Sequence, residues 1–266
     1  MSTLREVWQR DGASVGGWCV IPSPFAAELM GLAGFDWVCI DTQHGLIGYD
    51  AMVPMLQALA RTGTPAFVRV PWNQPDHIMK ALDAGAQGVV IPMVNSVAEA
   101  EAAVGACRYP PDGYRSWGPI RAALGVDGFT PASANRDVVC CVMVETAAAL
   151  ADLDEILAVP GIDAVYVGPN DMAVTHGMPP SADPSDPEHR RLITSVREAC
   201  ERHRIVAGIH CGTWETAARW RDEGFRMLNV ASDAVFLRGT AAGIVKQLAG
   251  EPAAEPGHKP TTSSYA

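Results

Sequence analysis

The sequence predicts an α/β protein folded as a closed (β/α)8 barrel, the TIM-barrel fold. Short apolar segments and longer helical segments alternate eight times along the chain. The apolar segments are continuous rather than alternating, which is typical of parallel strands buried on both faces. The chain has 266 residues, a usual length for one barrel, and its 48% hydrophobic content is sufficient for a large core.

The predicted strands, in chain order, are Ser14–Val20, Trp37–Asp41, Ala66–Val70, Gly88–Pro92, Val138–Glu145, Ala164–Gly168, Val206–His210 and Met227–Val230. The predicted helices between and after them are Pro24–Ala33, Asp50–Arg61, Pro75–Ala84, Val97–Cys107, Ala148–Ala158, Pro187–His203, Thr213–Glu223 and Ala234–Leu248. Helix start signals such as Asn95-Ser96, Asp186-Pro187 and Gly212-Thr213 support this assignment. An open doubly wound sheet is the alternative fold, but the sequence has no GxGxxG turn and no GxxxxGK[ST] loop.

Two segments depart from the alternation. Arg108–Arg136 is a long connection rich in Gly, Pro and aromatic residues, and connections of this length are usually functional or contact a partner. Gly250–Ala266 is rich in Pro, Ala, Ser and Thr and is predicted to be disordered. We therefore expect one catalytic domain over residues 1–249 and a tail over residues 250–266.

The overall charge and the cysteine pattern restrict the partners and the compartment. A net charge of −10 without a long basic segment disfavours nucleic acid and anionic membranes. No apolar stretch reaches the roughly 20 residues of a membrane span. The seven cysteines form no CxxC pattern, and several lie in apolar segments. We expect buried, reduced thiols in a cytoplasmic protein.

Polar residues gather where the predicted strands end, which is where a barrel of this kind holds its active site. They are Asp41, Gln43, His44, Arg69, Glu145, Asn170, Asp171, His210, Asn229, Ser232 and Asp233. Glu145 and Asp171 follow neighbouring strands, so their carboxylates could share one cation such as Mg²⁺ or Mn²⁺. Alternatively, Glu145 caps the following helix and Asp171 caps a turn after Gly168-Pro169.

Two further residues have both a functional and a structural interpretation. Arg69 lies between two valines and can bind an anion or a developing oxyanion, or it can form an internal ion pair with Asp41 or Asp83. His44 lies three residues after Asp41 and can act as a general base oriented by that carboxylate, or it can make only local hydrogen bonds. For His210 the structural interpretation, a histidine of the core or rim, is favoured.

Lysine placement bears on the mechanism. Lys80 and Lys246 fall inside predicted helices and Lys259 falls in the tail, so no lysine follows a predicted strand. A Schiff-base aldolase needs a desolvated lysine at its reacting centre. Enolate formation in this protein would therefore require a metal.

Several long segments resemble the HpcH/HpaI aldolase family, whose members are metal-dependent class II pyruvate aldolases with a barrel of the phosphoenolpyruvate/pyruvate type. They are FDWVCIDTQHG, VRVPWNQPDHIMKALDAGAQGVVIPMV, CRYPPDGYRSWGP, VMVETAAALADLDEILAVPGIDAVYVGPNDMA and GIHC. The similarity covers residues 15–237. It implies a 2-oxo acid and an aldehyde as substrates and a divalent cation, Mg²⁺, Mn²⁺ or Co²⁺, as cofactor. It also implies a homo-oligomer, a hexamer built as a trimer of dimers, in which the last helix is exchanged between subunits.

The resemblance also implies residue roles. Glu145 and Asp171 correspond to the metal ligands, Arg69 to the arginine at the keto oxygen, and His44 with Asp41 to the residues that move protons. Backbone amides of the segment from Gly168 through Pro169 and Asn170 to Asp171 would hold the substrate carboxylate, with Trp18 and Met143 also lining the substrate site. Asp83 corresponds to a supporting acid near a subunit contact.

Met143 departs from the pattern of some members, which have glutamine at that position. The pocket is less polar there, so the sequence leaves pyruvate and hydroxypyruvate open as donors. The predicted reaction is reversible aldol cleavage of a 4-hydroxy-2-oxo acid through a metal-stabilised enolate. The alternatives are a lyase acting on a CoA thioester, an oxaloacetate decarboxylase that uses the same site, and a non-enzymatic scaffold.

Overall fold

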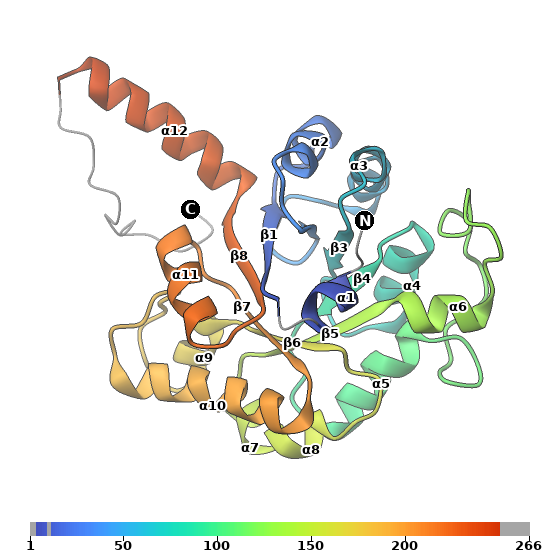
Figure 1. The fold of residues 1–266 in the computed structure, drawn as a ribbon. Helices are drawn as coiled ribbons and strands as arrows, with labels where there is room; N and C mark the ends of the chain where they lie inside the picture. The colour runs from blue at the N-terminus through green and yellow to red at the C-terminus, as the bar shows by residue number, and fades with distance from the viewer. Residues whose placement is uncertain (1–3, 10–11, 251–266) are drawn as a thin grey trace.

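The eight strands of the protein form one closed parallel barrel in chain order (Figure 1). This is a computed structural model that describes residues 4–9 and 12–250. The strands are β1 Ser14–Cys19, β2 Trp37–Asp41, β3 Ala66–Arg69, β4 Gly88–Ile91, β5 Val139–Val144, β6 Ala164–Val167, β7 Val206–Ile209 and β8 Met227–Ser232. Nearly every strand residue is buried, as expected for strands covered on both faces. The predicted fold class is therefore confirmed.

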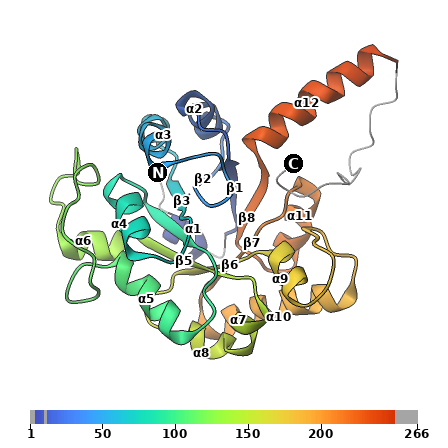
Figure 2. The same cartoon turned by 180° about the vertical axis from the view of Figure 1, so that it is seen from behind.

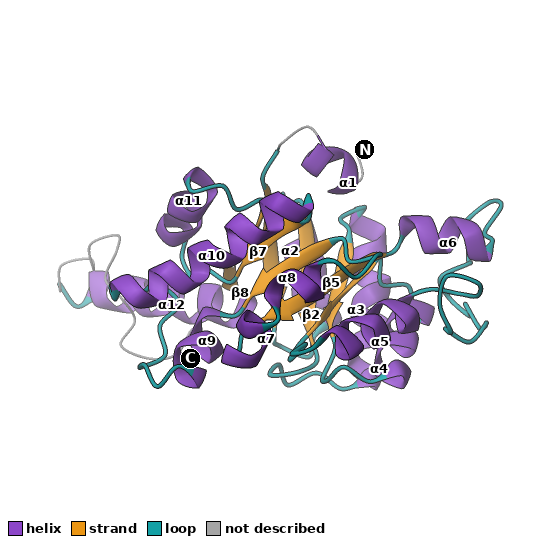
Figure 3. Cartoon of the chain, turned by 90° about the horizontal axis from the view of Figure 1, so that it is seen from below, coloured by secondary structure: helices purple, strands orange, loops and turns teal. Residues whose placement is uncertain are grey.

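Helices surround the strands on the outside of the barrel (Figure 3). Their bounds are α1 Leu4–Gln9, α2 Pro24–Leu32, α3 Tyr49–Thr62, α4 Pro75–Asp83, α5 Val97–Cys107, α6 Pro131–Asp137, α7 Ala147–Ala151, α8 Leu153–Leu157, α9 Pro169–Thr175, α10 Pro187–His203, α11 Trp214–Asp222 and α12 Asp233–Leu248. The short helices α1, α6 and α9 were not predicted. Lys80 lies in α4 and Lys246 in α12, so both lysines of the described residues are helical. The predicted tail lies outside the described residues from residue 251 onward.

Two helix predictions need correction. The single helix predicted over Ala148–Ala158 is two short helices, α7 and α8, because Asp152 has φ −107° and ψ 23° and interrupts the helical conformation. Asp171 lies in the first turn of α9 and not in an isolated turn. Pro169 occupies the first helical position of α9, where its fixed φ is favourable and its missing N–H costs nothing. The acid predicted to bind metal is therefore held on a helix.

The barrel interior is closed by a cluster of large side chains below the site. It includes Trp18, Trp37, Phe67, Tyr166 and Met227. Trp18 stacks on Tyr166 with ring centroids 5.7 Å apart, and Trp37 packs edge-on against both rings. A second, larger apolar cluster fills the layer between the strands and the helices. The interior rings form a rigid floor for the polar groups at the strand ends.

The last helix, α12, projects away from the barrel (Figures 1 and 2). Its start is anchored, because the Asp233 carboxylate accepts hydrogen bonds from the amides of Val20 and Ile21 at 2.9 and 3.2 Å. Asp233 is the buried residue of this helix. The exposed apolar residues of α12 are Phe236, Leu237, Ile244, Val245 and Leu248.

All seven cysteines are buried with free thiols, as predicted. Among the described residues, no helix is both long enough and apolar enough to cross a membrane.

Candidate active site

Asp41 and Arg69 occupy facing positions at the ends of neighbouring strands β2 and β3. Arg69 Nε donates to Asp41 Oδ1 at 2.9 Å and Arg69 Nη2 donates to Oδ2 at 2.5 Å. The carboxylate also accepts hydrogen bonds from Trp18 Nε1 and from the backbone amides of Gln43 and His44. Burial alone would raise the pKa of Asp41, but the Arg69 charge and these hydrogen bonds outweigh it and lower that pKa. The Arg69 charge and the hydrogen bonds therefore favour the ionised form of Asp41.

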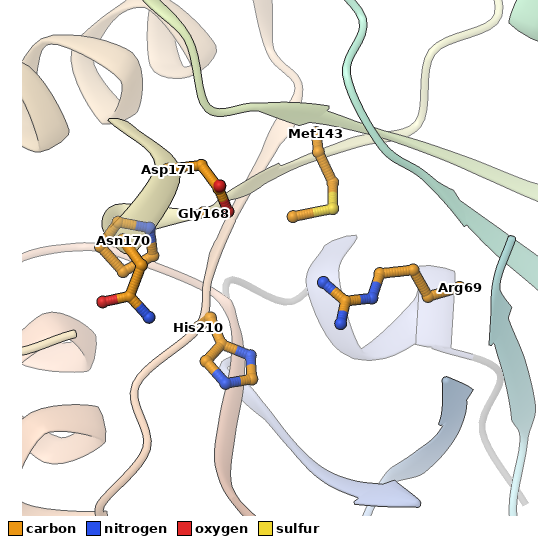
Figure 4. Close-up of a pocket in the computed structure, with 7 residues that line it drawn as sticks. Arg69, Met143, Gly168, Asn170, Asp171 and His210 are labelled. Atoms are coloured by element: carbon orange, nitrogen blue, oxygen red, sulfur yellow. The ribbon is translucent and has the colours of Figure 1, made fainter. Parts of the chain in front are cut away.

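A pocket opens beside Arg69 at the mouth of the barrel. Seven residues line it, namely Arg69, Met143, Gly168, Pro169, Asn170, Asp171 and His210. Figure 4 shows these residues around one space; they come from β3, β5, the start of α9 and the residue after β7. The structure thus brings together six of the seven residues predicted to bind substrate.

Trp18, the seventh, does not line this pocket. It lies behind the pocket, with the Arg69 guanidinium 5.1 Å from its ring centroid. Trp18 is fully buried and donates its indole N–H to Asp41 at 3.2 Å. Trp18 thus links the interior rings Trp37 and Tyr166 to Asp41, Arg69 and His210 of the site.

Glu145 directly follows β5 and is 3% exposed. Its Oε1 accepts a 2.8 Å hydrogen bond from the backbone amide of Met93, in the loop after β4. Burial raises the pKa of Glu145 to about 7; the Met93 amide opposes this rise, the nearby charge of Asp171 adds to it, and Arg69 opposes it. The structure therefore places a buried carboxylate within electrostatic range of Asp171 and Arg69.

Gly168 packs closely against Glu145. A Cβ atom at this position would lie 2.4 Å from Glu145 Oε2 and 3.2 Å from Met143 Cε. Any side chain at this position would force the Glu145 carboxylate to move, so glycine allows the close approach. The backbone that leads into α9 can thus approach the Glu145 carboxylate, and this brings Asp171 to the same side of the barrel mouth.

Two histidines hold the segment that carries Asp171, one from α10 and one at the C-terminal end of α9 itself. His189 of α10 is buried and hydrogen-bonds to Pro169, which lacks an N–H, so the imidazole donates to the Pro169 carbonyl. His176 Nδ1 lies 2.7 Å from the Met172 carbonyl. These contacts bind both ends of the first turn of α9. Asp171 itself is exposed at the mouth of the barrel.

His210 is the pocket residue for which the sequence analysis favoured a structural role. It directly follows β7, and its ring packs edge-on against Trp18 at 5.3 Å and against Tyr166 at 6.4 Å between centroids. Burial and, to a lesser extent, the Arg69 charge lower its pKa to about 3, although the Asp41 charge opposes them. His210 is thus a neutral imidazole at the pocket wall. Its position immediately after a strand was the signal that could have identified it.

His44 lies next to Asp41 at the mouth of the barrel. Its side chain is exposed, and the contact with Asp41 is a 3.2 Å hydrogen bond from the His44 backbone amide. His44 is not among the residues that line the pocket. Asp83 lies elsewhere, bound to Arg115 at 2.6 Å, so the internal acid that pairs with Arg69 is Asp41 and not Asp83.

The chemistry of Glu145 and Asp171 fits a hard divalent cation. Glu145 and Asp171 carry like charge, Oε2 of Glu145 faces the space that a Cβ at Gly168 would fill, and burial opposes the ionisation of Glu145. A cation between them would relieve the repulsion and stabilise the ionised form. Oxygen donors of this kind suit Mg²⁺ or Mn²⁺. Among the described residues, no group of three or more His, Cys, Asp or Glu side chains is arranged to hold a metal ion.

Comparisons with known proteins agree with this geometry. A sequence profile of the HpcH/HpaI aldolase/citrate lyase family matches residues 15–239. A hydroxypyruvate/pyruvate aldolase from Rhizorhabdus wittichii is 38% identical over 92% of this chain and 98% of its own. A 2-dehydro-3,6-dideoxy-6-sulfogluconate aldolase from Pseudomonas putida is 35% identical over 93% of this chain and 97% of its own.

The crystal structure of an HpcH/HpaI family protein from Burkholderia cenocepacia superposes with a TM-score of 0.87. It is 29% identical, and the superposition covers 94% of this chain and all of that one. The profile match spans most of the chain, and the structural match extends over the whole barrel. The chain therefore belongs to the HpcH/HpaI aldolase/citrate lyase family.

Proposed function

We propose that this protein is a class II aldolase that makes and cleaves 4-hydroxy-2-oxo acids through the enolate of pyruvate or hydroxypyruvate. The observation that carries the proposal is the approach of Glu145 to Gly168, which sets a buried carboxylate beside Asp171 and next to Arg69. Arg69 and Asp171 line one small pocket, and the Glu145 carboxylate lies against Gly168 in its wall. These groups provide the charges that a 2-oxo acid and its cation require. The names of the relatives, hydroxypyruvate/pyruvate aldolase among them, support this donor class.

Each residue of the site has a part in this reaction. Arg69 binds the keto oxygen of the donor and stabilises the charge that develops there when the C3 proton leaves. Asp41 fixes the plane of the Arg69 guanidinium through its two hydrogen bonds. Backbone amides of the Gly168–Asp171 segment bind the substrate carboxylate. His44, at the exposed rim next to Asp41, exchanges the proton with solvent.

The family is divalent-metal-dependent, and we propose Glu145 and Asp171 as the metal ligands in this chain. A bound Mg²⁺, Mn²⁺ or Co²⁺ would withdraw charge from the 2-oxo group and so acidify its C3 protons. Glu145 would then be held ionised, because the cation offsets the burial that raises its pKa. His210, a neutral imidazole at the pocket wall, contributes shape and hydrogen bonding rather than charge.

Aldol cleavage and addition assays test this function directly. Pyruvate and hydroxypyruvate are each offered with a panel of aldehydes, before and after chelator treatment and metal restoration. We expect turnover with the metal and its loss with EDTA. The E145A variant should be inactive both with added metal and after EDTA treatment. Full activity of E145A in EDTA-treated enzyme would refute the proposed mechanism.

Oxaloacetate decarboxylation passes through the same enolate and should be assayed in parallel, because the family also includes citrate lyases. A rate higher than that of aldol cleavage would make decarboxylation the main reaction. A CoA thioester substrate is less compatible with this site. Arg69 is the only cationic side chain among the described residues lining the pocket, and it is already paired with Asp41. The phosphates of CoA would need further positive charge.

We also propose that the protein is a homo-oligomer, a hexamer arranged as a trimer of dimers, with α12 packed on a neighbouring subunit. The exposed apolar side chains of α12 support this, since Leu237, Val245 and Leu248 are 67%, 67% and 84% exposed in the single chain. A hexamer of 28.2 kDa chains has a mass of about 169 kDa, six times 28.2. Light scattering coupled to size-exclusion chromatography measures this mass.

A further inference from the structure

We propose that Asn95 is a positioning residue for the metal site: it holds Met93 in a left-handed conformation, so that the Met93 amide fixes one oxygen of Glu145. This inference rests on the assignment of Glu145 as a metal ligand. It assigns a role in that site to the loop between β4 and α5, which contributes no side chain to the pocket.

The Met93 amide is the hydrogen-bond donor that orients Glu145. It donates to Glu145 Oε1 at 2.8 Å. The other carboxylate oxygen, Oε2, faces the space beside Gly168. One oxygen is thus occupied by the protein backbone while the second is directed toward the side of the mouth that holds Asp171. A metal ligand gains affinity when a hydrogen bond to its other oxygen fixes its orientation.

This donor geometry depends on an unusual backbone conformation. Met93 has φ of +57°, and among the described residues the other non-glycine residue with positive φ is Arg204. The left-handed region costs an ordinary residue roughly 1–2 kcal/mol because Cβ crowds the following carbonyl. Such strain persists only where surrounding contacts hold it, and it tends to occur at functional sites.

The Asn95 side chain supplies these contacts. Its Nδ2 donates to the Met93 carbonyl at 2.8 Å, and its Oδ1 accepts a short hydrogen bond from the Thr146 hydroxyl. Thr146 is the residue after Glu145 and caps α7 by accepting from the Ala149 amide at 3.1 Å. Asn95 therefore contacts both Met93, whose amide binds Glu145, and Thr146, the residue after Glu145.

Asn95 is itself fixed by the start of α5. Its backbone amide donates to Glu99 Oε2 at 2.6 Å, and Ser96 caps the helix by accepting from the Glu99 amide at 3.3 Å. The loop is thus bound to α5 on one side and to Thr146 on the other. Met93 has little freedom to return to an ordinary conformation while these bonds last.

The test measures metal affinity directly, by titrating Mn²⁺ into chelator-stripped protein in a calorimeter. Asn95→Ala should weaken Mn²⁺ binding about tenfold, within the 10- to 100-fold range typical of residues that orient a metal ligand. At saturating Mn²⁺ its kcat should approach that of the wild type, because the ligands themselves remain. The Mn²⁺ concentration for half-maximal activity should rise by the same factor as the dissociation constant.

A second substitution distinguishes positioning from a general loss of structure. Glycine adopts positive φ without the Cβ penalty. Adding Met93→Gly to the Asn95→Ala variant should therefore restore most of the Mn²⁺ affinity that Asn95→Ala loses. Asn73→Ala is the matched control: Asn73 also donates to the α5 start, at the Glu99 carbonyl 3.0 Å away, but it contacts neither Met93 nor Glu145. Its Mn²⁺ affinity should equal that of the wild type.

Asn95→Asp serves as the test if Asn95→Ala does not fold. Aspartate retains an oxygen for Thr146 and loses the N–H that binds the Met93 carbonyl. Mn²⁺ affinity of a folded Asn95 variant within twofold of the wild type would overturn the inference. So would a loss in Asn95→Ala that Met93→Gly does not recover. Glu145→Gln separates this inference from the proposed function: unchanged Mn²⁺ affinity in that variant would refute Glu145 as a ligand, whatever the Asn95 variants do.

Discussion

Asp41 and Arg69 form a buried ion pair with two hydrogen bonds across the ends of β2 and β3, at 2.9 and 2.5 Å. Their side chains are 0% and 3% exposed. The structural interpretation of Arg69 is therefore confirmed; Arg69 also lines the pocket, where its predicted role at the keto oxygen stays a prediction. The pair fixes the Arg69 guanidinium at the pocket wall. The lowered pKa of Asp41 favours the ionised carboxylate, and so the ion pair, in mild acid.

Replacing Asp41 by Asn should destabilise the protein by about 3–5 kcal/mol, because it leaves the Arg69 charge buried without its counter-ion. The catalytic efficiency should also fall, since the guanidinium loses its fixed orientation. Urea unfolding measures the first effect and kcat/KM the second. Arg69→Lys, which keeps the charge without the two-point geometry, should retain more stability than Asp41→Asn while still losing activity. Equal stability of Asp41→Asn and wild type would contradict this account.

The metal-free protein should become less stable as pH rises through the Glu145 titration. The folded-state pKa of Glu145, about 7, lies above its ordinary value of 4.5. Between pH 4.5 and 7 the folded state therefore keeps a proton that the unfolded state has lost. Ionisation in the fold then costs about 3 kcal/mol above pH 7, and the cost disappears below pH 4.5. Glu145→Gln should remove this dependence of stability on pH, and it should stabilise the metal-free protein at pH 8. Urea unfolding at pH 5 and pH 8 provides the comparison.

His210 should act in the opposite direction. Its folded-state pKa of about 3 lies below the ordinary value of 6.5, so the unfolded state gains a proton that the folded state refuses. Stability supported by the neutral imidazole is present above pH 6.5 and is lost as pH falls toward 3. Between pH 4.5 and 6.5 the effects of Glu145 and His210 oppose each other. His210→Phe should therefore make the protein less sensitive to acid, which thermal unfolding between pH 4 and 7 would measure.

Adding a methyl group at Gly168 should disable the site while preserving the fold. A Cβ there would lie 2.4 Å from Glu145 Oε2, so the carboxylate must move. We expect Gly168→Ala to lower kcat/KM at least about 100-fold, the scale of loss that a misplacement near 1 Å can produce. Gly48→Ala is the matched control, because no atom lies within 4 Å of a Cβ at that position. Wild-type activity in Gly168→Ala would show that the close approach to Glu145 is unimportant.

A divalent metal should stabilise the folded protein by binding it and not the unfolded chain. At a free metal concentration of 100 times the dissociation constant, the expected gain is about 2.7 kcal/mol. Thermal unfolding of stripped protein with Mg²⁺, Mn²⁺ or Co²⁺ measures it. The gain should vanish in Glu145→Gln. A similar gain in that variant would place the metal at another site.

The sequence alone determined the barrel and the positions of its polar strand ends. Continuous apolar segments such as Trp37–Asp41 are typical of strands buried on both faces, and this pattern is visible without knowledge of any contact. Parallel strands in a closed barrel end on the same face, so Arg69, Glu145 and the Gly168–Asp171 segment could be assigned to one site.

Only the tertiary structure decided how these groups meet. It paired Arg69 with Asp41 rather than Asp83, placed His210 in the pocket and left His44 exposed at the rim. It also showed the left-handed Met93 that binds Glu145. The sequence shows at which end of the barrel a side chain lies, because the position of each strand end follows from local periodicity. Rotamers, loop conformations and burial depend on neighbours distant in the chain, and no local pattern encodes them.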